Sequence, residues 1–193
     1  DMAAVAQALT KETLSARPPD IWRYREFLPL PPGAKAISLG ENMTPLIPVP
    51  RTGERLGVAG LLVKDEGRLP TGSFKARGMA VAVSMAAHLG VKRIAIPTAG
   101  NAGAGLAAYA TRAGIESFVF TPADTPEVTA SEIAFHGAKA WRVDGLVGDC
   151  AAIVDGGIDE MGWYDFTTLK EPYRVEGRRV RGLECAGQRG WGR

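Results

Sequence analysis

Short apolar runs alternate with longer amphipathic segments in the middle of the chain. The runs predict buried parallel strands, which read as nearly continuous hydrophobic segments. The longer segments carry apolar residues at steps of three and four, as at Leu106, Tyr109 and Ala113, which is the spacing of one helix face. The pattern therefore predicts strands at residues 93–97, 117–121, 138–143 and 163–166, and helices at residues 75–88, 101–113, 126–136 and 147–161.

Strands that alternate with helices of this length are joined by crossover connections, which place neighbouring strands parallel. We therefore expect an α/β fold, a parallel-sheet sandwich whose compact unit runs from the first to the last of these strands. Thr125 and Pro126 supply a cap and a first-turn proline for one helix, and Gly137 ends it. Gly156 and Gly157 weaken the last helix of the series.

The first third of the chain has a different pattern. Residues 2–15 predict a moderately amphipathic helix, which two prolines close. The prolines between residues 27 and 50 exclude a regular helix there and predict extended segments and turns. Residues 61–63 then predict a short buried strand, followed by a loop at residues 64–74.

Composition narrows the classes of partner. Hydrophobic residues make up 46% and charged residues 23% of the 193 residues, which is typical of a soluble globular protein. The net charge of +2 is too balanced to indicate a nucleic-acid or membrane-surface partner. No apolar run approaches the ~20 residues that span a bilayer, and the first residues lack the pattern of a signal peptide. We expect a cytoplasmic protein.

The cysteines and the late basic residues receive structural interpretations. Cys150 and Cys185 are not a closely spaced pair, so neither a zinc site nor a disulfide framework is indicated. Cys150 falls on the apolar side of a predicted helix and is expected to pack there. The basic excess near the end of the chain predicts a solvated face or a loose tail, with a phosphate-binding strip as the alternative; it comprises Arg178, Arg179, Arg181, Arg189 and Arg193.

The first candidate for chemistry is the loop that ends in Lys75, at the start of a predicted helix. Ser73 can cap that helix. Exposed backbone N–H groups and the helix dipole make the position electropositive, and Arg77 adds to this, so the charged ammonium is disfavoured. A lysine that is often neutral can attack an aldehyde cofactor and remain bonded as an imine. The alternative is a solvated lysine at a helix start.

The second candidate is the loop at residues 97–103, which joins a strand end to a helix start. Ligands of open α/β sheets bind at this edge. Its small residues allow close backbone approach, and their N–H groups can hold a carboxylate. Asn101 offers one donor and one acceptor, although a helix N-cap is its alternative role.

Other chemistries have weaker signals. Gly103, Gly105 and Ala108 fit a dinucleotide-binding fingerprint followed by Asp124, which leaves a nicotinamide enzyme as an alternative. A helix that starts at Asn101 would instead bury both glycines in its first turns. The two histidines fall near predicted helix ends without a neighbouring nucleophile or metal-ligand pair, so no metal site is expected; they are His88 and His136.

Taken in order, four motifs resemble fold-type II pyridoxal-phosphate enzymes, and among these the threonine synthases. They are GENMTPL (40–46), KDE (64–66), PTGSFKARG (70–78) and AGNAGAGLAAYA (99–110). The segments IWRYREFLP and TLKEPYRVEG resemble the threonine synthases specifically. The resemblance covers nearly the whole chain.

The resemblance implies roles for particular residues. Lys75 would be the Schiff-base lysine of pyridoxal 5'-phosphate and the main proton shuttle. Phe74 and Asn101 would join it in binding the cofactor, Asn101 through the phenolic oxygen. Arg174 is the candidate for the substrate phosphate, because a guanidinium fork matches phosphate oxygens; an exposed arginine is the alternative. The substrate carboxylate would lie against Thr98, Ala99, Gly100, Asn101 and Ala102.

The implied reaction converts O-phosphohomoserine and water into threonine and phosphate. A threonine or serine dehydratase-like lyase and a non-catalytic ligand-binding remnant are the alternatives. The expected partner is a small amino-acid substrate, and a homodimer is compatible with the resemblance.

The resemblance also divides the chain. Residues 1–75 would belong to a larger domain, residues 76–170 would form the smaller α/β domain, and residues 171–193 would return toward the larger one. The glycine-rich loop that grips the cofactor phosphate in this family has no counterpart here, so we expect a C-terminally truncated enzyme.

Overall fold

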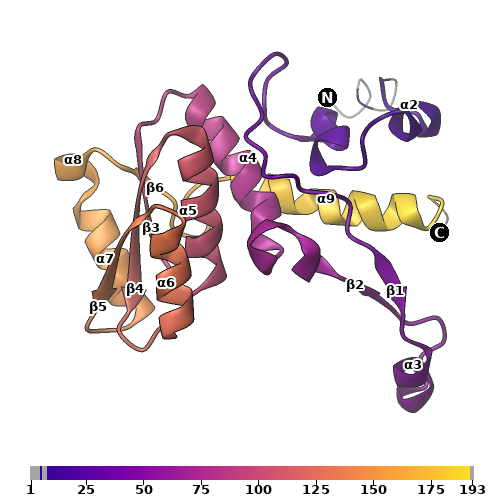
Figure 1. The fold of residues 1–193 in the computed structure, drawn as a ribbon. Coiled ribbons are helices and arrows are strands. Elements are labelled where there is room, and N and C mark those ends of the chain that lie inside the picture. Colours follow the sequence, from indigo (N-terminus) through magenta and orange to yellow (C-terminus); the bar gives the residue numbers. More distant parts are fainter. Residues whose placement is uncertain (1–4, 6–7, 192–193) are drawn as a thin grey trace.

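The computed structural model describes residue 5 and residues 8–191. Its long helix α4 (Lys75–His88) lies between two groups of elements (Figure 1). On one side is an α/β unit, and on the other are the N-terminal segments and helix α9 (Tyr173–Gln188). Because Lys75 is the first residue of α4, both groups of elements can contribute to its surroundings.

The α/β unit contains the predicted four-stranded parallel sheet. Its strand order is β5-β4-β3-β6, and all three strand pairs are parallel, as predicted. The strands are β3 (Arg93–Pro97), β4 (Glu116–Pro122), β5 (Lys139–Val143) and β6 (Tyr164–Asp165). The helices between them are α5 (Asn101–Ala113), α6 (Glu127–Phe135), α7 (Val147–Gly156) and α8 (Ile158–Met161).

Side chains of β3 and β4 alternate between two cores, as the pleat of a strand requires. Ile94, Ile96 and Val119 pack in the core that includes α4 and α5. On the opposite face, Ala95, Phe118 and Phe120 form a second core with Cys150 and Val154 of α7 and with Trp163. Helices therefore cover both faces of the sheet, which confirms the α/β sandwich and the packing role of Cys150.

The predicted helix at residues 147–161 is wrong in one respect, because it is divided into α7 and α8. The break occurs at Gly157, against which the Trp163 ring packs. A Cβ atom on Gly157 would lie 2.2 Å from Cζ2 of Trp163, so only glycine allows this contact. The glycines that weakened the prediction mark the actual break.

The N-terminal part departs further from the expectations. Residues 2–4 and 6–7 of the predicted helix at residues 2–15 lie outside the described residues. Helix α2 (Lys11–Ser15) begins only after Thr10, whose hydroxyl accepts a hydrogen bond from the backbone N–H of Thr13. A capping threonine therefore interrupts the predicted amphipathic run.

The strand predicted at residues 61–63 forms, as β2 (Leu62–Lys64), but it is not buried. It pairs only with β1 (Leu46–Pro48), antiparallel, and the side chain of Val63 is 47% exposed. The two-stranded sheet of β1 and β2 and the short helix α3 (Pro50–Leu56) project from the body of the molecule (Figure 1). A two-stranded ribbon without a covering layer has no core face in which to bury its side chains.

The prediction of a loose C-terminal tail is wrong, because residues 173–188 form α9. This helix crosses α4 at two glycines: a Cβ on Gly177 would lie 2.4 Å from the carbonyl oxygen of Arg77, and one on Gly78 would lie 2.9 Å from that of Arg174. The predicted solvated face is confirmed for three of the basic residues, which are exposed: Arg179, Arg181 and Arg189. Arg193 lies outside the described residues.

No helix in the described ranges is long and apolar enough to cross a membrane.

Candidate active site

The two candidate loops meet in one open groove of about 440 Å³. Lys75 enters it from the start of α4, and residues 98–102 enter from the start of α5. Pro126 and Thr129 close the groove from the start of α6. Helix starts gather here because the carboxyl ends of parallel strands share one edge of the sheet. The structure thus brings together residues that lie about two dozen positions apart in the chain.

Lys75 occupies the position in which the sequence analysis placed it. Its backbone N–H donates to the hydroxyl of Ser73 at 3.2 Å, so Ser73 satisfies one free donor of the helix start. Its Nζ lies 4.9 Å from the centroid of the Phe74 ring. Burial lowers the pKa of the Lys75 ammonium, and the positive charges of Arg178 and Arg174 lower it further.

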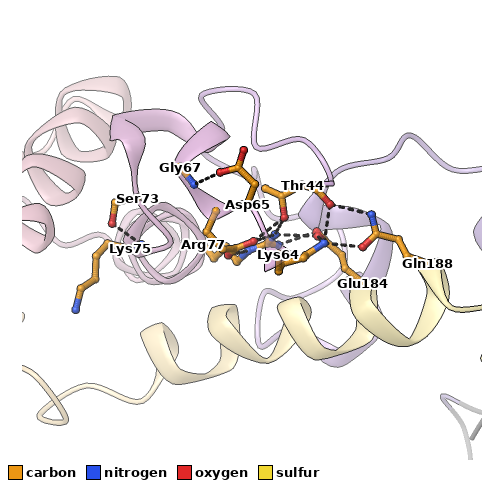
Figure 2. Close-up of polar contacts among 10 residues, drawn as sticks. Thr44, Lys64, Asp65, Gly67, Ser73, Lys75, Arg77, Glu184 and Gln188 are labelled. Atoms are coloured by element: carbon orange, nitrogen blue, oxygen red, sulfur yellow. Dashed lines mark hydrogen bonds and ion pairs between the residues drawn. The ribbon is translucent and has the colours of Figure 1, made fainter. Parts of the chain in front are cut away.

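This electrostatic cause differs from the expected one. Arg77 was expected to disfavour the Lys75 ammonium, but its side chain faces the other side of α4. Figure 2 shows the Lys75 side chain pointing away from the group of ion pairs around Arg77. Residues two apart on a helix do not face each other, which explains the separation. The cations that act on Lys75 come instead from α9.

The loop at residues 98–102 is held by its own polar groups. The buried Thr98 hydroxyl accepts from the N–H of Gly100 at 3.1 Å, and Gly100 O accepts from the N–H of Gly103 at 2.8 Å. Gly100 is the N-cap residue of α5, and Asn101 is its first helical residue with an exposed side chain. The alternative of Asn101 as the N-cap is therefore wrong, and its amide is free to meet a ligand.

The dinucleotide fingerprint is not supported by this geometry. Gly103 and Gly105 both lie within α5. A Cβ on Gly103 would lie 2.6 Å from Cγ2 of Thr98, so this glycine lets α5 pack closely on β4 and α6. Asp124 follows the end of β4 in a turn. Gly103 and Gly105 therefore allow close helix packing, and the hypothesis of a nicotinamide-dependent enzyme has no dinucleotide-binding motif to support it.

Arg174 is buried, so its alternative interpretation as an exposed arginine is wrong. It is 3% exposed and is the second residue of α9. Its Nε donates to Oε1 of Glu171 at 2.6 Å. Its two terminal nitrogens are also buried, yet neither has a hydrogen-bond partner among the described residues. Buried guanidinium donors without acceptors are costly, and they indicate a place for an anion.

Sequence reasoning placed Arg178 in a solvated face or a loose tail, with a phosphate-binding strip as the alternative, and did not name it as a site residue. Arg178 lies one helical turn after Arg174, and its guanidinium carbon is 5.7 Å from the centroid of the Phe74 ring. Its Nε is buried and finds no acceptor within the described part of the chain. Arg181 approaches the same ring at 5.9 Å. The signal that could have found Arg178 is its spacing of four from Arg174, which places two residues on one helix face.

On the other side of α4, Arg77 is the centre of an ionic network (Figure 2). Its guanidinium is 1% exposed and forms two hydrogen bonds with each of two carboxylates, Glu66 and Glu184, at 2.7–2.9 Å. Lys64 donates to Glu184 at 2.8 Å and to the side-chain oxygen of Gln188 at 2.7 Å. The hydroxyl of Thr44 completes the network by donating to Glu66 at 2.6 Å.

The network is electrostatically balanced. Burial by itself lowers the pKa of Arg77, but its hydrogen bonds to Glu66 and Glu184 outweigh burial and raise that pKa above its ordinary value. Burial by itself raises the pKa of Glu66, but the hydrogen bonds from Arg77 and Thr44 outweigh burial and lower that pKa below its ordinary value. Both groups therefore stay charged, and the network joins the early loops, α4 and α9.

Known proteins with similar sequences and structures indicate the family to which this chain belongs. A threonine synthase of Methanocaldococcus jannaschii is 36% identical over 194 residues, covering 99% of this chain and 47% of that relative. One of Methanosarcina acetivorans is 37% identical over 180 residues, covering 92% and 43%. A solved T.th. threonine deaminase superimposes with a TM-score of 0.67 at 28% identity, covering 78% and 47%. The chain thus spans less than half the length of these relatives.

The family described as pyridoxal-phosphate dependent enzyme matches residues 37–192, which include both loops of the groove and Arg174 and Arg178 of α9. With Lys75 and Asn101 in one groove at the carboxyl edge of a parallel sheet, the chain belongs to the family of pyridoxal-phosphate-dependent enzymes.

Proposed function

We propose that the protein is a pyridoxal-phosphate-dependent carbon–oxygen lyase of the threonine synthase type, which converts O-phosphohomoserine and water into threonine and phosphate. One observation carries the proposal. The groove holds Lys75 and Asn101, and the charge of the buried Arg174 lowers the pKa of Lys75. The two terminal nitrogens of Arg174 have no acceptor in the described structure. Similarity to threonine synthases over 92–99% of the chain supports it.

The residues of the groove fit the cofactor. The lowered pKa of Lys75 makes its amine neutral more often, which suits a covalent bond to the cofactor aldehyde. The exposed Asn101 amide, free of any capping role, suits the phenolic oxygen. Phe74 presents its ring beside the lysine. We therefore assign cofactor binding to Lys75, Phe74 and Asn101.

When bound, the cofactor supplies an electron sink that stabilises negative charge next to the amino group of the substrate. The residues of the chain perform the other tasks. The amine of Lys75 moves protons at the substrate carbons, and the helix start at Thr98, Ala99, Gly100, Asn101 and Ala102 binds the substrate carboxylate through N–H groups that lack intrahelical partners.

Arg174 distinguishes this reaction from that of a dehydratase. The substrate of a threonine or serine dehydratase carries a hydroxyl group on its β-carbon and no phosphate, whereas O-phosphohomoserine carries a phosphate ester on its γ-carbon. A hydroxyl would leave the two buried terminal nitrogens of Arg174 unsatisfied, whereas a phosphate accepts from both. The free donors therefore favour the phosphorylated substrate.

We also propose that the chain is divided as the sequence suggested, with residues 76–170 as the smaller domain. The sheet and its covering helices fall within this range, and α9 returns across α4 toward the N-terminal segments. A homodimer stays a prediction.

Borohydride reduction in the presence of pyridoxal 5'-phosphate tests the proposal. We expect the reduced cofactor on the peptide that contains Lys75, and phosphate release from O-phosphohomoserine. Lys75→Ala should lose the label and about 10²–10⁴-fold in rate, because it removes both the attachment point and the proton carrier. Lys92→Ala, at an exposed lysine outside the groove, is the matched control.

Mass spectrometry of the labelled peptides measures the first outcome, and a phosphate assay measures the second. Label distributed over surface lysines, with Lys75 unmodified, would refute the assignment of the cofactor site. A product that is a keto acid formed from threonine, without phosphate release from O-phosphohomoserine, would favour the dehydratase.

A further inference from the structure

The electropositive side of α4 and α9 contains more positive charge than the substrate assignment uses. Arg174 and Arg178 are four residues apart on α9 and therefore project from one face of the helix. Both act on the Lys75 ammonium, and both have buried nitrogen atoms without an acceptor in the described ranges. Arg178 is thus a second arginine oriented toward the region that Arg174 faces.

The acidic residues nearby do not neutralise this cluster. Within the described ranges, Glu171 accepts only from the Nε and the backbone N–H of Arg174. Glu176 is paired with Arg179 at 2.5 Å, and Glu184 belongs to the network around Arg77. Burial, the neighbouring charge of Arg174 and that of Arg181 lower the pKa of Arg178, with only Glu171 acting in the opposite direction. A surplus of positive charge therefore remains next to the groove.

The position of Arg178 is set by the Phe74 ring. The ring has the Lys75 ammonium at 4.9 Å and the Arg178 guanidinium at 5.7 Å from its centroid. Stacking on an aromatic face orients a guanidinium without using its N–H donors, which stay available for hydrogen bonds. The start of α9 adds the partial positive charge of a helix N-terminus at Arg174.

We propose that Arg178 and Arg174 together bind a dianionic phosphate group, so that Arg178 is a specificity-determining residue for the phosphorylated substrate. The two terminal nitrogens of Arg174 and the Nε of Arg178 provide donors for different oxygens of one phosphate. A second negative charge on the ligand balances the second arginine. This inference rests on the proposed function, since it names the second group that holds the same phosphate.

Binding of inorganic phosphate to the cofactor-saturated protein tests the inference. Saturation with pyridoxal 5'-phosphate keeps the probe from the cofactor's own site, and isothermal titration calorimetry measures its Kd. Arg178→Gln should weaken phosphate binding by about 10-fold or more, the loss expected for one charge-assisted hydrogen bond. Arg178→Lys should recover part of the affinity. Arg179→Gln, on an exposed neighbour paired with Glu176, should change it less than about 2-fold.

A pH series separates ligand binding from a purely structural role of Arg178. The affinity difference between the wild type and Arg178→Gln should grow as pH rises through the second ionisation of phosphate, because the extra charge meets the second arginine. A role confined to stacking on Phe74 would give the same difference at every pH. Circular dichroism of each variant establishes that it is folded, and Arg178→Lys retains the charge if Arg178→Gln fails to fold.

The outcomes distinguish the two proposals. Equal phosphate affinity of the wild type, Arg178→Gln and Arg178→Lys, with the borohydride label still on Lys75, would overturn only the role of Arg178. Equal losses in Arg178→Gln and Arg179→Gln would also overturn it. Absence of the label from Lys75, together with phosphate binding that depends on Arg178, would overturn the proposed function and leave the anion site in place.

Discussion

Two groups of charged side chains lie on opposite sides of α4, and they differ in how their charges are satisfied. Around Arg77 the cations meet carboxylates and hydroxyl or amide groups in a closed network. Around Lys75 one carboxylate, Glu171, pairs with the Nε of Arg174, and Lys75 and Arg178 lie against the Phe74 ring. The terminal nitrogens of Arg174 and the Nε of Arg178 are buried without an acceptor in the described structure. A paired buried charge holds elements of the fold together, whereas an unpaired one indicates a ligand.

The reason for this difference is the cost of desolvation. Removing a charged group from water is unfavourable unless hydrogen bonds and an opposite charge replace the lost hydration. The Arg77 network meets this requirement within the chain. The Lys75 side does not, so its charge is compatible with burial only because the groove is open and because an anionic ligand can supply the missing acceptors.

The largest effect on stability is expected from breaking the paired network. Glu184→Ala removes the fully buried carboxylate that binds both Arg77 and Lys64, and leaves two buried cations without it. We expect the free energy of unfolding to fall by about 3–5 kcal/mol. Urea denaturation followed by circular dichroism measures this change.

Glu176→Ala is the matched control on the same helix. Its carboxylate pairs with the exposed Arg179, so its removal should cost about 0–1 kcal/mol. Equal destabilisation by the two variants would show that the buried network does not hold α9 against α4.

A smaller effect is expected on the unpaired side. Arg178→Met removes a cation that has no ionic partner among the described residues and replaces it with an apolar side chain that can still cover the Phe74 ring. The loss is limited to the cation–π contact, so the free energy of unfolding should change by less than about 1 kcal/mol. The same denaturation experiment measures it.

Arg77→Met is the matched comparison, because it removes the central cation of the network and leaves Glu66 with only the Thr44 hydroxyl and Glu184 with only Lys64 among the described residues. It should cost several-fold more stability than Arg178→Met. The contrast between the two sides of α4 fails if the two substitutions are equally destabilising.

The smallest effect concerns the titration of Lys75. Burial and then Arg178 lower the pKa of this ammonium, so the folded protein holds the proton less tightly than the unfolded chain does. Lys75 therefore contributes nothing to the pH dependence of stability while it is protonated in both the folded and the unfolded protein. The free energy of unfolding increases as pH rises from the lowered pKa of the folded protein to the ordinary pKa of the unfolded chain. Arg178→Gln should raise the pKa of Lys75 in the folded protein, which moves the lower limit of this pH window upward and narrows the window.

The pH dependence of the rate at which an acylating reagent modifies Lys75 measures the midpoint by mass spectrometry. Exposed Lys92 in the same sample is the internal reference, because it lies outside the groove. A midpoint that Arg178→Gln leaves unchanged or lowers would contradict the electrostatic action of Arg178 on the groove.

Much of the fold could be predicted from the sequence. The four strands and the helices at residues 75–88 and 101–113 were expected from periodicity alone, with bounds close to those observed. The helix at residues 147–161 was predicted too long because Gly157 breaks it to admit the Trp163 ring, a contact that local pattern does not show. The strand at residues 61–63 was expected to be buried because its apolar run resembles the sheet strands.

The candidate site was predicted in part. Lys75 and Asn101 were chosen from their places at helix starts, and the groove joins them. Arg178 was expected on a solvated face or tail, with a phosphate-binding strip as the alternative, because a charged residue on a helix of mixed polarity resembles a solvated one. The burial of its Nε depends on α9 crossing α4 where Gly78 and Gly177 allow close approach.

The sequence by itself determined the parallel sheet, the two loops and the positions of Lys75 and Asn101, because hydrophobic period and helix-start residues are local signals. Tertiary structure alone decided which buried arginine donors have an acceptor within the described chain. Arg77 meets Glu184, which lies 107 positions later, whereas Arg174 and Arg178 keep donors without acceptors. Ion pairing depends on which helix faces meet, and no short-range pattern records that.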